Sequence, residues 1–321
     1  MTEQVLLLVA TPGGHLHELV QLAQRMPGNS RVWITARTSQ SEALLRGERV
    51  EYVQPVGSRQ ALRAVQSIAG ASALLKRHDA RMVVSTGAAL CVPYMVAARA
   101  RGLPAHYIES ATRVDDISVS ARLLTRVPGV RMYHQGLREA PSDWTSTGSV
   151  FDGFAARRGS GSVNRVLVTL GSERFPFARM IDMVRRILPL GTDVVWQTGH
   201  TSVPRDLPGR VVPWMSFTDM ATQMARADVV VTHAGVGSVL AALDQGRVPL
   251  VLPRERRLGE HVDDHQSALV SLLRHRGLAV QLTNSTATSD KILEQMAGAC
   301  VDRSMVTPIV LDTAATRKWR H

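Results

Sequence analysis

The chain has few aromatic side chains and few cysteines, and each shortage excludes a class of protein. Aromatic residues make up only 4% of the 321 residues, which argues against a nucleic-acid partner held by base stacking. The two cysteines, Cys91 and Cys300, stand far apart and outside any His/Cys spacing pattern. We therefore expect neither a disulfide framework nor a zinc site.

Long hydrophobic runs are also missing. The start, "MTEQVLLLVATPGGH", holds six consecutive apolar residues with no basic residue before them, whereas a signal peptide needs a basic region and a membrane span needs about 18 apolar residues. We predict a cytoplasmic protein, with peripheral contact at the inner face of the membrane as a further expectation. The net charge of +11 favours an anionic partner, although a merely arginine-rich surface gives the same excess.

Short apolar runs rich in valine recur along the chain, separated by stretches with apolar residues at helical spacing. The runs are "VLLLVA", "RVWITA", "RMVVSTG" and "AHYIES" in the first half, then "RVLVTLG", "DVVWQTG", "DVVVTHAG" and "VPLVLP" in the second. The helical stretches include "HLHELVQLAQRM", "RQALRAVQSIAGASALLKRH" and "HVDDHQSALVSLLRHR". This alternation predicts an α/β protein with parallel sheets covered by helices on both faces.

Glycine, serine and arginine replace the apolar runs at "FDGFAARRGSGSVN", residues 151–164, which we interpret as a linker. The predicted domains are residues 1–152 and residues 164–321, with the last helix packing back on the first domain. Open α/β sheets bind ligands at the carboxyl ends of their strands. The motifs below all fall at such strand ends, which favours an enzyme over a structural protein.

The segment "THAGVGS", residues 232–238, joins a predicted strand to a predicted helix. Its glycines would let the backbone approach a diphosphate, and the helix dipole favours the negative charge. Ser238 could cap the helix or bind a phosphate oxygen, and His233 could donate a hydrogen bond to the ligand. An ordinary tight turn with a packed histidine explains the same residues. "TLGSERF", with Gly171 and Ser172, repeats the design.

The first predicted turn, "ATPGGHLHELVQL", places His15 at the start of a helix. An imidazole there can act as a general base, and Glu18, one turn further along, is a candidate to orient its ring. A histidine that only caps the helix or positions a phosphate is the alternative. His17 leaves open which ring faces the ligand.

A dinucleotide-binding dehydrogenase is a rival for this fold class. Its fingerprint requires a third glycine and an acidic residue after the second strand. "TPGGHL" and "HAGVGSVL" both lack that glycine, and Arg37 follows "RVWITA". Arg37 could suit a 2′-phosphate, so NADP binding is disfavoured but stays open as an alternative.

Residues 116–138, "DISVSARLLTRVPGVRMYHQGLR", mix leucine, valine and methionine with four arginines. Such a stretch can lie at a membrane interface. A helix with one core-facing side and one solvated side is the alternative.

Several segments resemble the two-part glycosyltransferases of polysaccharide and lipid-linked oligosaccharide assembly. "GGHLHEL", "RMVVSTGAALCVPYMVAARARGLPAHYIES" and "TRVDDISVSARLLTRVPGVRMYHQG" resemble the acceptor half of those enzymes. "TLGSERFPF", "WQTGH", "SFTDMATQMARADVVVTHAGVGSVLAAL" and "RRLGEHVDDHQSALV" resemble the donor half. The sequence thus resembles a fusion of both halves within the glycosyltransferase 28 type.

The resemblance implies a GT-B architecture, in which two Rossmann-like domains with parallel sheets face each other across a cleft. It implies a metal-independent donor site in the second domain and inversion at the anomeric carbon. The implied donor-side residues are Gly171, Ser172, Phe217 for uracil, His233, Gly235, Gly237 and Ser238 for the diphosphate, and Asp264, His265 and Gln266 for the sugar. The resemblance matches His15 to the family's N-terminal glycine-rich turn and histidine, near the acceptor. With it we assign Glu18 as the catalytic partner and Gly13, Gly14 and Glu109 to the acceptor side.

The predicted reaction moves a hexose or hexose derivative from a UDP-sugar to a polyprenyl-diphosphate-linked sugar, with no cofactor and no essential metal. A soluble transferase acting on a small natural product stays open, as does a non-catalytic nucleotide-sugar-binding subunit. The latter is suggested by Ala241, because related enzymes often carry at that position an acid that binds the ribose diol.

Overall fold

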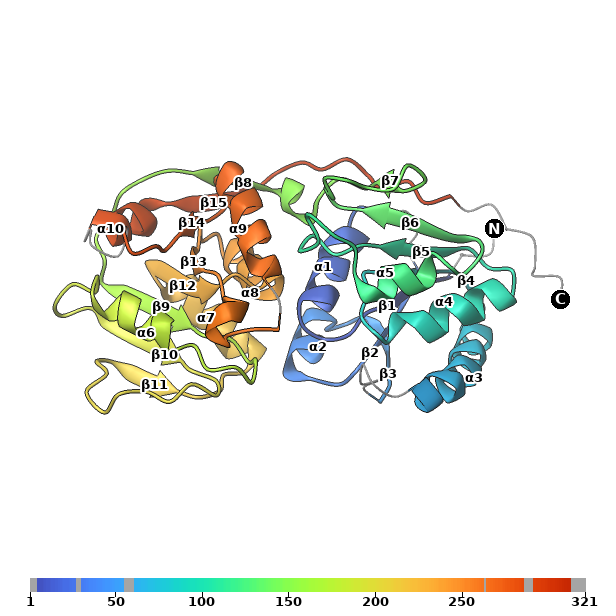
Figure 1. Cartoon of the computed structure of the whole chain (residues 1–321), viewed down its shortest axis with the longest axis horizontal. Helices are drawn as coiled ribbons and strands as arrows, with labels where there is room; N and C mark the ends of the chain where they lie inside the picture. The colour runs from blue at the N-terminus through green and yellow to red at the C-terminus, as the bar shows by residue number, and fades with distance from the viewer. Residues whose placement is uncertain (1–4, 27–29, 55–60, 263, 286–290, 313–321) are drawn as a thin grey trace. The chain divides into compact units, whose positions relative to one another are not determined.

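The computed structural model describes residues 5–26, 30–54, 61–262, 264–285 and 291–312. The chain divides into two compact units (Figure 1). The residues up to Val150, together with those from Val306 onward, form the first unit, and Phe151–Met305 form the second.

The first unit contains a sheet with strand order β3-β2-β1-β4-β5-β6-β7, in which all neighbouring strands are parallel. Its strands are β1 (Val5–Val9), β2 (Arg31–Thr35), β3 (Arg49–Tyr52), β4 (Ala80–Ser85), β5 (Ala105–Ile108), β6 (Val130–His134) and β7 (Thr145–Ser146). Its helices are α1 (Gly14–Ala23), α2 (Ser39–Leu44), α3 (Ala61–Arg77), α4 (Cys91–Ala100) and α5 (Val119–Leu124).

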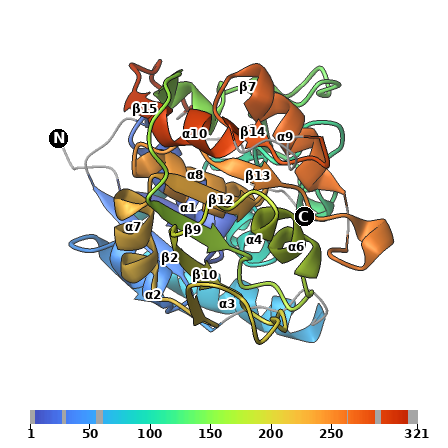
Figure 2. The ribbon, with the colours of Figure 1, turned by 90° about the vertical axis from the view of Figure 1, so that its left-hand side faces the viewer.

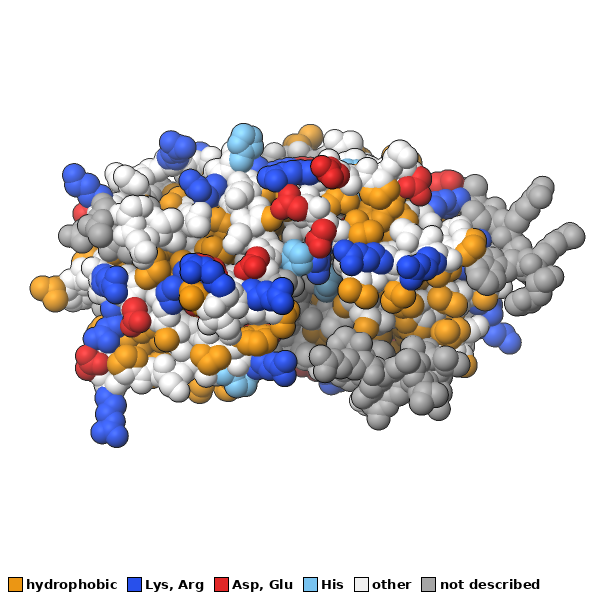
Figure 3. Space-filling view, viewed as in Figure 1, with side chains coloured by type: hydrophobic (Ala, Val, Ile, Leu, Met, Phe, Trp, Pro, Cys, Tyr) orange, Lys and Arg blue, Asp and Glu red, His pale blue; other side chains and the backbone are white. Residues whose placement is uncertain are grey.

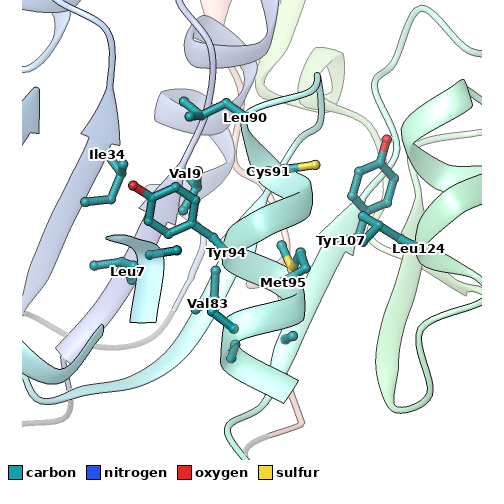
Figure 4. Close-up of a cluster of buried hydrophobic side chains, with 14 of the residues drawn as sticks. Leu7, Val9, Ile34, Val83, Leu90, Cys91, Tyr94, Met95, Tyr107 and Leu124 are labelled. Atoms are coloured by element: carbon teal, nitrogen blue, oxygen red, sulfur yellow. The ribbon is translucent and has the colours of Figure 1, made fainter. Parts of the chain in front are cut away.

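The main core of this unit lies between the sheet and helices α3, α4 and α5 (Figure 4). Leu7, Val9, Ile34 and Val83 of the strands are fully buried there, and Tyr94 of α4 packs with them. Parallel strands covered on both faces need apolar side chains at successive positions, which explains the continuous runs in the sequence. Each fully buried aliphatic side chain contributes about 1.5–3 kcal/mol to the stability of the core.

The second unit contains a parallel sheet with strand order β11-β10-β9-β12-β13-β14. Its strands are β9 (Arg165–Thr169), β10 (Asp193–Gln197), β11 (Arg210–Val212), β12 (Val229–His233), β13 (Leu250–Leu252) and β14 (Val280–Gln281). Its helices are α6 (Ala178–Arg185), α7 (Phe217–Arg226), α8 (Val236–Asp244), α9 (His265–His275) and α10 (Lys291–Gly298). Figure 2 shows α6 and α7 on opposite faces of this sheet. The predicted α/β class with parallel sheets is confirmed.

The two sheets share one topology. In each, the strand order runs outward from a central strand in one direction and then restarts on its other side, between β1 and β4 in the first unit and between β9 and β12 in the second. In doubly wound sheets, ligands bind outside the carboxyl ends of the strands at this switch point. The loops after β1, β4, β9 and β12 are therefore where a site is expected.

The segment predicted as a linker is partly a strand. Residues Phe154–Arg157 form β8, which pairs antiparallel with β15 (Cys300–Arg303). The Phe154 ring is buried and lies 4.5 Å from the Arg303 guanidinium carbon, so packing orders a stretch whose composition suggested a loop. Residues 154–157 of the expected linker thus belong to a two-stranded sheet of the second unit.

The chain returns to the first unit after β15, and the described part of this return, up to residue 312, contains no helix. Ile309 and Leu311 are buried there, and the Ile309 N–H donates a 2.7 Å hydrogen bond to the Arg25 carbonyl. The residues after Asp312, where a last helix would have to lie, are outside the described residues.

Candidate functional site

The candidate residues of the first unit lie at the switch point of its sheet. Gly13 and Gly14 follow β1, and α1 begins at Gly14 and carries His15 in its first turn. The Gly13 backbone is held by the amide side chain of Gln40, which accepts from its N–H and donates to its carbonyl at 3.1 Å. The loop after β4 packs against His15, since a Cβ added to Gly87 would come within 3.1 Å of the ring carbon Cε1.

A hydrogen bond between the loops fixes the tautomer of His15. Its Nδ1 lies 2.9 Å from the carbonyl oxygen of Thr86, and the Thr86 hydroxyl donates back to the His15 carbonyl at 2.7 Å. A carbonyl can only accept, so Nδ1 carries the proton. The Nε2 atom of neutral His15 therefore has a lone pair, which is the state a general base requires.

The electrostatics keep this imidazole neutral. Burial lowers the pKa of His15 most, the Thr86 hydrogen bond opposes that effect, and nearby Arg113 lowers the pKa further. His15 as a residue is still partly exposed, whereas His17 is completely buried. His15 is therefore the histidine of this turn that a ligand can reach.

Glu18 does not orient the His15 ring, which corrects the role that we assigned to it. Its carboxylate is completely buried and accepts hydrogen bonds from the Ser110 hydroxyl (2.6 Å), the Ala111 N–H (2.9 Å) and the Gln135 amide (2.8 Å). Burial raises the pKa of Glu18 to about 7, against the effect of these three donors. Glu18 thus ties α1 to the ends of β5 and β6, and Thr86 performs the orienting role.

Glu109, assigned to the acceptor side, is also held inside the unit. It is 1% exposed, and its carboxylate accepts from the Tyr107 hydroxyl (3.1 Å), the Ser110 N–H (3.1 Å) and the Ser118 N–H (2.8 Å). Asp115, an exposed carboxylate of the same unit, pairs with Arg138 at 2.9 Å. Of these groups, His15 is the one that is partly exposed and whose lone pair is directed by a hydrogen bond.

In the second unit, His233 ends β12 and its ring lies against two glycines. A Cβ at Gly171 would lie 2.5 Å from its Nε2, and a Cβ at Gly235 would lie 2.3 Å from its Cε1. We predicted that these glycines make room for a diphosphate. In the structure, they first make room for the imidazole.

Both nitrogens of the His233 ring are bonded within the turn. Nδ1 accepts from the Gly235 N–H at 3.0 Å, and Nε2 lies 3.0 Å from the Ser238 hydroxyl oxygen. Burial lowers the pKa of His233 to about 3, with Arg254 and His261 lowering it further. The ring is thus neutral, and the described geometry does not offer it as a donor to a diphosphate. Ser238, in the first turn of α8 beside Gly237, is partly exposed and can make that contact.

Gly171 does not open a helix, contrary to our prediction, because α6 begins only at Ala178. A loop with the exposed Ser172 lies between them. The Gly171 backbone is held by Gln197, whose amide oxygen accepts from its N–H (3.2 Å) and whose amide nitrogen donates to its carbonyl (3.1 Å).

Sequence reasoning missed Arg254, which organises this loop. Its guanidinium is 1% exposed and donates to the carbonyls of Leu170 (2.7 Å), Phe175 (2.8 Å) and Glu260 (2.9 Å). Burial lowers its pKa, while Glu173 and Glu260 raise it. Its position directly after β13 and "VPLVLP" was the available signal, because that strand end is next to the switch point.

The remaining donor-side residues sit at helix starts. Phe217 is the first residue of α7, after the N-cap Ser216, whose hydroxyl accepts from the Asp219 N–H at 3.0 Å. His265 is the first residue of α9.

The neighbours of His265 have bonds within the unit. The Asp264 carboxylate accepts from the Arg256 N–H at 2.8 Å, and the Gln266 amide oxygen accepts from the Arg254 N–H at 3.1 Å. Asp263 lies outside the described residues. Ala241 is 7% exposed and belongs to a buried cluster with Met224.

The stretch 116–138 is not one continuous surface. Leu124 and Met132 are buried, the latter within β6. Val119 and Leu123 of α5 are 69% and 46% exposed, and Arg122 is exposed beside them. Over the part of this unit where Figure 1 labels α4 and α5, Figure 3 shows basic side chains among hydrophobic ones. The basic, apolar surface is therefore restricted to α5 and its flanks.

Two general features bear on ligands. Within the described residues, no group of three or more His, Cys, Asp or Glu side chains is placed to hold a metal ion. None of the helices in the described part of the chain combines the length and apolarity that crossing a membrane requires. Arg37, weighed for a 2′-phosphate, pairs with Glu42 at 2.8 Å and stacks 4.1 Å above Tyr52.

The fold and part of the sequence are similar to those of known glycosyltransferases. The chain is similar to the crystal structure of Acinetobacter baumannii MurG, with a TM-score of 0.53 and 18% identity, covering 91% of this chain and 89% of that one. Residues 165–306 match the model of the glycosyltransferase family 28 C-terminal domain. The whole chain thus has the GT-B fold, and its second unit is similar to the C-terminal domain of glycosyltransferase family 28.

Two curated proteins that are similar to this chain have the same name, UDP-N-acetylglucosamine--N-acetylmuramyl-(pentapeptide) pyrophosphoryl-undecaprenol N-acetylglucosamine transferase. The relative from Sorangium cellulosum is 28% identical over 264 residues, which are 74% of this chain and 62% of that protein. The relative from Chlorobium luteolum is 26% identical over 227 residues, which are 63% of this chain and 60% of that protein. The match thus spans about three fifths of the relatives' length.

Proposed function

We propose that the protein is an inverting glycosyltransferase that moves a hexose or hexose derivative from a UDP-sugar to a polyprenyl-diphosphate-linked sugar. The observation that carries the proposal is the His15 Nδ1 to Thr86 hydrogen bond, at the switch point of a unit joined to a family 28 domain. It gives a partly exposed, neutral imidazole whose Nε2 can take a proton. The names of the two curated relatives, which describe transfer from a UDP-sugar to a lipid-linked acceptor, support the substrate classes.

His15 acts on the acceptor. A sugar hydroxyl has a pKa far above 7, so its proton must leave as the oxygen attacks the anomeric carbon. Nε2 accepts that proton, and the Thr86 carbonyl stabilises the imidazolium through Nδ1–H. The charge of Arg113 and the first turn of α1 make that imidazolium a stronger acid, which favours proton release after transfer.

The second unit takes the UDP. The leaving diphosphate gains negative charge as the glycosidic bond breaks, and the N-terminus of α8, which has no side-chain cap, supplies N–H donors and a favourable dipole. Ser238 adds a hydroxyl. We propose that the N-terminus of α8 and the Ser238 hydroxyl together replace a metal ion. Full activity in excess EDTA is the expected result, and activity that returns only with Mg²⁺ would refute this part.

The acceptor's lipid would bring the protein to an anionic membrane surface. Val119 and Leu123 of α5 are exposed, and arginines flank them, which is the combination that binds peripherally. We propose this surface as the membrane contact.

The central test is turnover of a panel of UDP-hexoses with a polyprenyl-diphosphate-sugar acceptor, using the parent protein and His15→Ala. Loss of a general base costs about 10²–10⁴-fold in rate and leaves donor binding largely intact. The control is His78→Ala, because His78 pairs with Glu51 at 2.9 Å and precedes β4, at the opposite end of the strand from Thr86. Near-parental turnover of His15→Ala would remove His15 as the base.

The same assay separates the two alternatives. Transfer to soluble natural products but not to the lipid acceptor would favour the small-molecule enzyme. Binding of UDP with no transfer to any acceptor would favour a non-catalytic subunit.

A further inference from the structure

We infer that His233 is a positioning residue, which makes Ser238 a hydrogen-bond donor toward the diphosphate and does not contact the nucleotide itself. This inference rests on the proposed function, because it concerns how the proposed donor site works. It replaces the simpler view in which the histidine of this turn binds the phosphate directly.

The first step is the placement of the ring. His233 is 9% exposed, and its ring lies against Gly235 of the same turn and Gly171 of the loop after β9. Gly235 has φ −77° and ψ 134°, a conformation open to any residue, so the backbone alone does not require glycine there. The space for the imidazole does, because a Cβ would lie 2.3 Å from Cε1.

The second step is the direction of the hydrogen bonds. The Gly235 N–H can only donate, so Nδ1 of His233 accepts and carries no proton. In the neutral ring, the proton is then on Nε2, which lies 3.0 Å from the Ser238 oxygen. Nε2–H donates to that oxygen, and the hydroxyl proton of Ser238 is left to donate to another group.

The third step is what that group can be. Ser238 is partly exposed in the first turn of α8, where the unpaired N–H groups and the dipole favour an anion. A hydroxyl that receives one hydrogen bond becomes a better donor in the next, because the chain of bonds is polarised. A phosphate oxygen is a charged acceptor and forms the stronger class of hydrogen bond.

The fixed tautomer matters because Ser238 could otherwise donate to the ring. If Nε2 lacked the proton, the hydroxyl would point its hydrogen at His233 and present only lone pairs to the diphosphate. The Gly235 N–H prevents this. The low pKa of His233 keeps the ring neutral over the whole physiological range, so that the Gly235 hydrogen bond selects the tautomer throughout.

A double-mutant cycle tests the inference, with UDP as the probe in calorimetry. His233→Asn keeps an oxygen near the Nδ1 position for the Gly235 N–H and loses the donor to Ser238. His233→Gln places an N–H near the Nε2 position and serves as the matched control. We expect His233→Asn and Ser238→Ala each to weaken UDP binding about 10- to 100-fold, and His233→Gln to remain within about threefold of the parent.

The double variant His233→Asn/Ser238→Ala decides the matter. If His233 acts through Ser238, the double variant binds UDP no more weakly than Ser238→Ala does. If the two losses multiply, His233 contacts the nucleotide independently and the inference is wrong.

A second measurement uses the unmodified protein, in case the His233 variants do not fold. The ¹⁵N chemical shifts of the ring should report the Nε2–H tautomer from neutral pH down to about pH 5. An Nδ1–H tautomer overturns the inference. Failure of the parent to bind UDP would instead refute the proposed donor site, so the two failures are distinguishable.

Discussion

The close approach of Gly235 to the His233 ring predicts how much stability the protein loses when a methyl group is added at Gly235. In Gly235→Ala the new Cβ would lie 2.3 Å from Cε1 and 2.8 Å from Nδ1. The ring cannot simply move away, because Gly171 packs against its Nε2. Overpacking of this kind costs about 1–3 kcal/mol. A unit of this size then melts about 2–12 °C lower, which differential scanning calorimetry can measure.

Two other glycines separate the steric effect from backbone strain. Gly171 and Gly191 have nearly the same left-handed φ, +83° and +82°, but only Gly171 has the ring beside it. Gly191→Ala should cost only the strain, about 1–2 kcal/mol, partly offset by the lower entropy of the unfolded chain. Gly171→Ala should cost more than Gly191→Ala, by the overpacking energy. A Gly235→Ala protein that melts with the parent would refute the placement of the ring.

Removal of the ring provides the complementary result. In a His233→Ala background, Gly235→Ala should no longer destabilise the protein, because the colliding atoms are gone. An undiminished effect of Gly235→Ala in that background would show that some other contact requires the glycine.

Three further predictions concern other parts of the chain. Changing both Arg122 and Arg126 to glutamate should lower the affinity for phosphatidylglycerol-containing vesicles about 10-fold or more, since each basic residue contributes about 1 kcal/mol at such a surface. Equal co-sedimentation of variant and parent would remove α5 from the proposal. Folding raises the pKa of Glu18 to about 7, so the folded protein binds more protons than the unfolded chain between about pH 4.5 and 7. The free energy of unfolding should therefore fall by up to about 3 kcal/mol as the pH rises through that window. Glu18→Gln should lack this loss, and identical pH slopes for the two proteins in urea unfolding would contradict the argument. Arg254→Met should destabilise the protein by at least about 2 kcal/mol, because three buried carbonyl groups lose their hydrogen-bond donor. Arg185→Met, which removes an exposed ion pair with Asp206, should change the stability little. Similar denaturant midpoints for the two variants would count against the role of Arg254.

The sequence predicted the central strands of both sheets and missed the strands farther out, β3, β6, β7, β11 and β14. The eight valine-rich runs correspond to β1, β2, β4, β5, β9, β10, β12 and β13. The strands β3, β11 and β14 lie at sheet edges, and their sequences, "RVEY", "RVV" and "VQ", are short or polar. An edge strand has one neighbour and more solvent contact, so it needs no continuous apolar run. β6 was missed because arginine and histidine interrupt it.

The candidate site also contains residues that could be predicted from the sequence and partners that could not. His15, His233 and Ser238 could be located from the sequence because they follow strand patterns directly. The partners that define their chemistry could not. Thr86 is 71 residues from His15, and Arg254 is 84 residues from the Leu170 carbonyl that it binds. Local periodicity contains no information about contacts of that separation, and Glu18 was assigned to the wrong partner because only its spacing from His15 was visible.

The return of the chain to the first unit has a consequence for biosynthesis. The second unit is one continuous segment, Phe151–Met305, whereas the first needs residues from both sides of it. During translation, all residues of the second unit are synthesised before Ile309 and Leu311, although synthesis of the first unit began earlier. The hydrogen bond from the Ile309 N–H to the Arg25 carbonyl and the burial of these two side chains can therefore form only at the end of synthesis. The unit whose synthesis starts first is thus the last to have all its residues, and a chain truncated after Met305 would contain the whole second unit but an incomplete first one.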